Sequence, residues 1–112
     1  MTEQEQQNIK AFAQIAGAQR TAYLAAIGKP LAQSPEHLEQ LTLYYLTNKN
    51  AVVSSLHEDW SHDQYKKGWT FGPYDEEKKT HPMLVAFNDL PTEKQVEDLL
   101  FMQTVQTLSR LM

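Results

Sequence analysis

Residues 57–91 have the sequence HEDWSHDQYKKGWTFGPYDEEKKTHPMLVAFNDLP. This segment contains both tryptophans of the chain, three of its four histidines, two of its four glycines and three of its five prolines. Glycine and proline restrict where a backbone turns, and large aromatic side chains fix how it packs. The concentration of these residue types in one segment predicts a defined local architecture.

The composition is that of a small globular protein. The 112 residues fit one domain (1–112), with 41% apolar and 21% charged residues. Cysteine is absent, which excludes disulfides and thiol chemistry, and the formal charge of −4 argues against nucleic acid as a partner. The opening MTEQEQQNIK is unlike a signal peptide, and no apolar run is long enough to span a bilayer. We therefore expect a cytoplasmic protein with no membrane partner.

The spacing of apolar residues predicts helices at residues 5–27, 35–48, 55–67 and 91–110. Gly28 is expected to end the first helix through a positive φ. Ser34 is expected to cap the second, because serine accepts hydrogen bonds from free backbone N–H groups at a helix start. Ser55 and Glu58 have the spacing of a capping box for the third.

The segment between the last two helices is rich in turn-forming residues. Residues 68–88 are expected to form an arm with a turn at residues 73–80. Its two β-prone runs, 69–71 and 84–87, are expected either to pair like a hairpin or to form extended arms. The predicted fold class is therefore mainly α with short β segments (α+β), as a compact helical fold.

The apolar faces of these elements predict which side chains form the core. Phe12, Leu41, Val85 and Leu100 are expected to be buried. The last helix is apolar on two faces, and the first is rich in alanine, which permits close approach of another helix. A homodimer would bury this surplus apolar surface.

The sequence contains no recognisable catalytic, metal or cofactor motif. Gly68 and Gly72 bracket a loop that lacks phosphate-loop spacing, and both are expected to supply a positive φ. His57 and His62 are five residues apart, about 140° around a helix, which does not suit a shared metal. We expect a protein that is not an enzyme and that holds no metal or cofactor.

Trp60 and Trp69 are the most informative side chains for binding. They lie on either side of Gly68 and could form a platform on which a planar base stacks, or could both be core residues. His81 precedes Pro82, which favours extended backbone, and is expected to hydrogen-bond the turn at 73–80.

Charged residues surround the glycine loop. The basic residues are Lys66, Lys67, Lys78 and Lys79, and the acidic residues are Asp75, Glu76 and Glu77. They could form a self-compensating solvated turn. Alternatively, one or two of the lysines, with Arg20, could contact ligand phosphates.

The pattern H-E-x-W, then K-x-G-W-x-x-G, then D-x-x-K-K-x-H-P-x-L-V-x-F-x-x-L-P resembles the ryanodine receptor repeat, or RyR, domain. The resemblance covers about residues 55–108. Residues 1–50 are similar to the helical leader of single-repeat RyR-domain proteins of bacteria and phages. The matching positions are His57, Trp60, Gly68, Trp69, Gly72, Asp75, Lys78, His81, Pro82, Leu84, Val85, Leu90 and Pro91.

The resemblance implies a site for an adenine-type nucleotide between facing aromatic rings of two paired repeats, so one repeat would need a second copy. The candidate ligand-binding residues are Trp60, Trp69, His57, Tyr74, His81, Lys66, Lys79 and Arg20. The expected function is non-enzymatic binding of a nucleotide-derived small molecule, as a sensor or sponge of a defence signal in a bacterial or phage-infected cell. The alternative is a protein-interaction module that uses the same groove.

Overall fold

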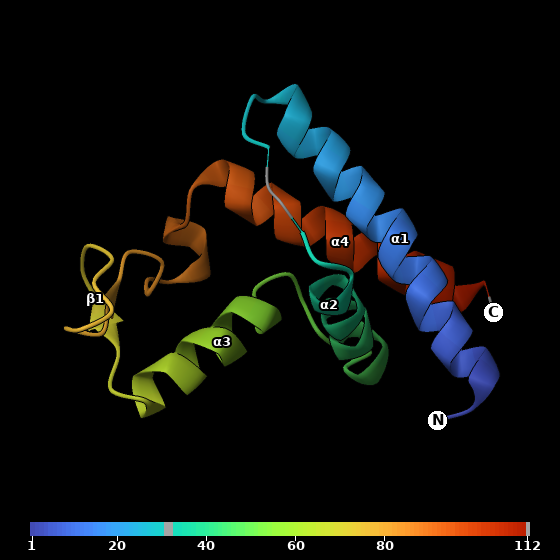
Figure 1. Ribbon diagram of the computed structural model, residues 1–112, viewed down its shortest axis with the longest axis horizontal. Helices are drawn as coiled ribbons and strands as arrows, with labels where there is room; N and C mark the ends of the chain where they lie inside the picture. The colour runs from blue at the N-terminus through green and yellow to red at the C-terminus, as the bar shows by residue number, and fades with distance from the viewer. Residues whose placement is uncertain (31–32, 112) are drawn as a thin grey trace. The chain divides into compact units, whose positions relative to one another are not determined.

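The computed structural model describes residues 1–30 and 33–111 (Figure 1). In chain order its elements are α1 (Glu3–Ala26), α2 (Pro35–Thr47), α3 (Ser55–Lys66), β1 (Thr70–Phe71), β2 (Thr80–His81), the 3-10 helix η1 (Phe87–Asp89) and α4 (Thr92–Arg110). The predicted class, mainly α with short β segments, is confirmed. Each predicted helix has an observed counterpart whose ends differ by no more than a turn.

The contacts divide the chain into two compact units, and α4 contributes to both. The first unit is Met1–Asn50 with Val96–Met112, and the second is Ala51–Gln95. The expectation of a single domain over residues 1–112 stays a prediction. Each unit is described by itself below.

In the first unit, α1 packs against α2 and α4. Gly17 permits the close approach to α2, because a Cβ built at this position would lie 2.7 Å from Leu38 Cδ1. The buried apolar side chains of this unit are Phe12, Ala13, Ala16, Leu24, Leu41, Tyr45, Phe101, Met102 and Val105. The predicted burial of Phe12 and Leu41 is therefore confirmed.

Two core predictions are wrong by one position. Leu100 is half-buried, whereas its neighbour Phe101 is only 1% exposed, because the buried face of α4 runs through Phe101 and Val105. In the second unit Val85 is half-buried and Leu84 is 2% exposed. Both elements are apolar at consecutive positions, so the apolar pattern alone does not identify the inner side chain.

The helix starts confirm one predicted cap and correct another. Ser34 precedes α2, and its hydroxyl accepts a hydrogen bond from the His37 backbone N–H at 3.1 Å, as predicted. The predicted capping box at Ser55 is wrong, because Ser54 is the N-cap of α3. The Ser55 hydroxyl accepts instead from the Val52 N–H at 2.9 Å, which closes the turn before the helix.

The predicted strand pairing is only half right. Strands β1 and β2 pair in parallel, with Thr70 opposite Thr80 and Phe71 opposite His81. The run at 84–87 is not a strand: it leads from a turn into η1. Two side chains of α3 donate to carbonyl groups of this run: His57 Nε2 to Val85 O, and the Tyr65 hydroxyl to Leu84 O. These carbonyl groups therefore have hydrogen-bond partners without a neighbouring strand.

The glycines of the second unit have different roles. Gly68 has a φ of +90° just after α3, as predicted. Gly72 does not have the predicted positive φ. A Cβ at this position would lie 3.1 Å from Thr80 Cβ, a tight contact that glycine avoids. The left-handed residue of this loop is instead Lys79, with a φ of 56°.

We expect Gly68→Ala to lower the free energy of unfolding by about 1 kcal/mol, because a side chain disfavours the left-handed region. A Cβ at this position would contact only the Lys79 side chain, at 3.9 Å, so the cost would be conformational rather than steric. Gly68→Asn should cost less, since asparagine tolerates this region. Urea unfolding of the three proteins measures the difference, and equal stability of Gly68→Ala and the parent would contradict it.

Candidate ligand-binding site

Three aromatic side chains of the second unit, Trp60, Trp69 and Tyr74, meet around the ring of His81. Its ring centroid lies 5.2 Å from Trp60, 5.6 Å from Tyr74 and 6.5 Å from Trp69, and the first two contacts are edge-to-face. Trp69 also contacts Tyr74 at 6.3 Å. These distances are in the range in which aromatic pairs attract one another. We call Trp60, Trp69, Tyr74 and His81 the aromatic cluster.

Short local elements position each ring of the cluster. Trp60 projects from α3, Trp69 follows the Gly68 helix stop, and His81 lies on β2. Tyr74 lies in the turn between the strands. Asp75 stabilises that turn, because its Oδ1 accepts hydrogen bonds from the backbone N–H groups of Glu77 and Lys78, at 3.0 and 3.1 Å.

The cluster is partly open to solvent. Trp60, Trp69 and His81 are half-buried, and Tyr74 is 65% exposed. Neither tryptophan is fully enclosed, so each ring contributes to packing and keeps surface that another molecule could contact. Phe71, on β1, is exposed to a similar degree, at 63%.

His57 supports the cluster from inside. The residue is 6% exposed, and its Nε2 lies 2.7 Å from the Val85 carbonyl, to which it donates. Its ring packs against Trp60 at 5.7 Å and against Phe87 at 6.2 Å. His57 thus orients Trp60 rather than offering a free polar group to a ligand.

His81 is held by the residues that follow it. Its Nδ1 accepts a hydrogen bond from the Met83 N–H at 3.0 Å, so the neutral ring carries its proton on Nε2. The predicted hydrogen bond from His81 to the turn at 73–80 is wrong, because the local bond to Met83 takes its place. The contact with that turn is the edge-to-face packing on Tyr74.

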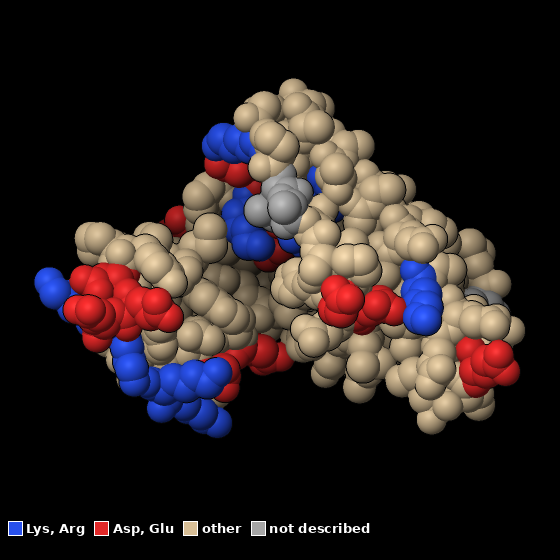
Figure 2. Space-filling view, viewed as in Figure 1, with Lys and Arg blue, Asp and Glu red and all other residues tan. Residues whose placement is uncertain are grey.

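The lysines lie beside the cluster, at the end of α3. Lys79 Nζ donates to the Lys67 carbonyl at 3.1 Å, and Lys67 pairs with Asp63 at 2.9 Å in a largely exposed contact. Lys66 is also exposed. Figure 2 shows basic and acidic side chains gathered side by side in the region of β1. Lys79 therefore already has a structural role, because its ammonium group binds the Lys67 carbonyl. Of the two candidate phosphate contacts, Lys66 is the more available to a ligand.

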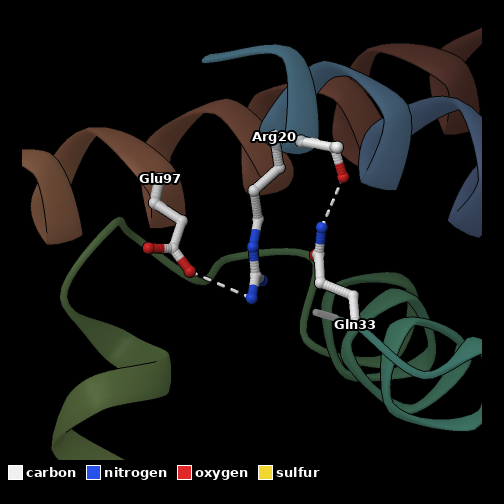
Figure 3. A network of polar contacts seen from close by, with 4 residues as sticks. Arg20, Gln33 and Glu97 are labelled. Carbon is white, nitrogen blue, oxygen red and sulfur yellow. Dashed lines mark hydrogen bonds and ion pairs between the residues drawn. The ribbon is translucent and has the colours of Figure 1, made fainter. Parts of the chain in front are cut away.

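Arg20 has a different role from the predicted one. It lies in the first unit, where its guanidinium pairs with Glu97 at 2.9 Å, with only 5% and 6% of the two side chains exposed (Figure 3). The guanidinium also lies 5.9 Å from the centroid of Phe101. Because a buried carboxylate already neutralises it, we do not include Arg20 in the candidate site.

Other polar groups near this pair, of which Tyr45 is buried, were not predicted from the sequence. Tyr45 is 2% exposed, and burial, reinforced by the nearby Asp98, raises the pKa of its phenol. Gln33 donates to the Thr21 hydroxyl at 2.6 Å in the same region (Figure 3). The available signal was the spacing of Glu97 and Phe101, which puts an acid on the apolar face of α4.

No helix within residues 1–30 and 33–111 is long and apolar enough to cross a membrane. No group of three or more histidine, aspartate or glutamate side chains in the same ranges could hold a metal ion.

The fold and the cluster define a small, mainly helical protein with a partly exposed aromatic cluster, contributed by α3, β2 and the segments next to β1. The family model of the RyR domain matches residues 35–111, so this chain belongs to the RyR domain family. The match includes α2 and is therefore wider than the 55–108 suggested by the sequence motifs. No solved structure matches the chain.

Proposed function

We propose that this protein binds a nucleotide-derived small molecule through its aromatic cluster, with an adenine-type base against the tryptophans, and does not convert it. The observation that carries the proposal is the convergence of Trp60, Trp69 and Tyr74 on His81 with solvent-accessible ring surface. Stacking of one base on an aromatic side chain contributes about 1–3 kcal/mol.

Polar groups beside the rings suit such a ligand. Within residues 1–30 and 33–111, the Nε2–H of His81 has no hydrogen-bond partner, whereas the other ring nitrogen is already bonded. This N–H could donate to a base nitrogen or a sugar oxygen. Lys66 is exposed at the end of α3 and could approach a phosphate.

The same hydrogen bonds support binding without chemistry. A general base needs an unprotonated nitrogen that faces the reactant. The unprotonated Nδ1 of His81 is occupied by the Met83 N–H. His57 is only 6% exposed, so a bound ligand has little access to its ring. A protein that holds a signalling nucleotide without converting it would act as a sensor or sponge of that signal during phage infection. The homodimer stays a prediction, as the arrangement that would bring two clusters face to face.

A thermal-shift titration with adenosine, AMP, ATP and ribose 5-phosphate tests the proposal. A ligand at a hundredfold excess over its Kd stabilises a protein by about 2.7 kcal/mol. We expect the three adenine compounds to raise the melting temperature and ribose 5-phosphate, which lacks the base, to have little effect. Equal effects of all four would contradict recognition of the base, because the ribose is the only part that the four compounds share.

Substitutions locate the site. Trp60→Ala should weaken adenosine binding by ten- to a hundredfold, the equivalent of losing about 1–3 kcal/mol of stacking, with helical circular dichroism retained. Tyr74→Ala removes a ring that is 65% exposed and tests the same cluster with less risk to the fold. Phe71→Ala is the matched control, because Phe71 is exposed to a similar degree and, among the ring contacts of residues 1–30 and 33–111, none joins it to the cluster. Unchanged affinity in both cluster variants would reject this site.

The second candidate function is a protein-interaction module. It is favoured by the exposed rings of Phe71 and Tyr74, which lie three residues apart in the sequence. A library of short displayed peptides tests it: a peptide ligand should lose binding in both Phe71→Ala and Tyr74→Ala, whereas a nucleotide should lose it only in the second.

A further inference from the structure

The first unit contains a cavity that the aromatic cluster does not use. It has a volume of about 560 Å³ and is lined by the start of α1, the end of α2 and the end of α4. This volume is in the range of small-molecule sites. Ile9, Leu43 and Leu46 form apolar parts of its wall, and Leu43 is 40% exposed. The cavity therefore offers apolar surface that a small ligand could cover.

The charged side chains on the cavity wall are mainly basic. Lys49, just after α2, and Arg110, at the end of α4, both line it. Within the part of the chain that the structure describes, neither has an ion-pair partner. The acid on the wall is Glu5, whose carboxylate already accepts a hydrogen bond from the Thr2 hydroxyl at 3.1 Å. A chain of net charge −4 thus places two cations at one cavity whose wall is partly apolar.

We propose that this cavity is a second ligand site, which takes a small amphipathic anion. The apolar body of the ligand packs against Ile9, Leu43 and Leu46, and its carboxylate or phosphate lies between Lys49 and Arg110. Lysine and arginine near helix C-termini also stabilise the helix dipole. The helix dipole would explain why Lys49 and Arg110 are basic. It would not explain why both line a cavity that also exposes the apolar side chain of Leu43.

Titration of the full chain with octanoate, octyl phosphate and octanol, followed by amide chemical shifts in NMR, tests the proposal. We expect octanoate or octyl phosphate to shift the amides of Ile9, Leu43 and Leu46, and to bind at least tenfold more tightly than neutral octanol. The comparison of the two anions shows which headgroup the site prefers. Octanol binding as tightly as both anions would overturn the proposal, as would shifts confined to residues 51–95.

Substitutions at exposed positions complete the test. Lys49→Gln and Arg110→Gln should each weaken anion binding about tenfold, as expected for loss of one charge-assisted hydrogen bond. Leu43→Trp should fill the cavity and block binding. Tyr74→Ala, which lies in the other unit, should leave anion affinity unchanged while it lowers adenosine affinity, so the two proposals fail separately. Unchanged affinity in both charge variants would reject the site even if Leu43→Trp disturbs the fold.

Discussion

Arg20→Met is expected to lower the free energy of unfolding by about 3–5 kcal/mol, because it removes the cation from a buried ion pair. Arg20 Nη2 lies 2.9 Å from Glu97 Oε1, and water reaches only 5% and 6% of the two side chains. The substitution leaves Glu97 with a buried negative charge and without this counter-ion. Domains of this size are usually stable by only about 5–15 kcal/mol, so the variant should be partly unfolded at moderate temperature.

The double variant Arg20→Met/Glu97→Met separates the charge effect from lost packing. Replacing both partners of a buried pair by apolar side chains is often close to neutral, because no charge remains to be desolvated. We expect it to recover most of the stability that Arg20→Met loses, as measured by urea unfolding. Additive losses in the two single variants and the double variant would show that the pair is not coupled.

Lys67→Met is the matched control for this prediction. Lys67 and Asp63 have the same N–O separation of 2.9 Å, but their side chains are 60% and 57% exposed. Exposed pairs contribute about 0–1 kcal/mol, because water already solvates both charges. A loss in Lys67→Met as large as that in Arg20→Met would contradict the role assigned to burial.

Phe101→Ala is expected to cost about 3–5 kcal/mol, the range for deleting a buried aromatic side chain. Phe101 is 1% exposed, packs against Tyr45 with 6.4 Å between ring centroids, and lies under the Arg20 guanidinium. Its removal therefore opens a cavity at the point where α1, α2 and α4 meet in the first unit.

Leu100→Ala is the internal comparison, one residue earlier on the same helix. Leu100 is half-buried, so its truncation should cost at least 1 kcal/mol less than Phe101→Ala. Thermal or urea unfolding of the two variants measures the difference directly. If Leu100→Ala proves the more damaging, the buried face of α4 has been assigned to the wrong residues.

Sequence alone determined the features that depend on neighbouring residues. The helices follow from apolar spacing, the Ser34 cap from one hydroxyl near one N–H group, and the Gly68 stop from the freedom of glycine at positive φ. The aromatic cluster was predictable for the same reason, because Trp60, Trp69, Tyr74 and His81 lie within one short segment. Turns within that segment bring them together without any distant part of the chain.

Tertiary structure decided the features that depend on side chains distant in sequence. The pairing of Arg20 with Glu97, the choice of Phe101 over Leu100 and the cavity formed by three helix ends all require packing of α1, α2 and α4. A local sequence pattern predicts that a helix has an apolar face. It does not determine which residues of that face point to the core, or which element the helix packs against. Tertiary packing determines both, because an arginine can be buried as an ion only where a buried carboxylate pairs with it.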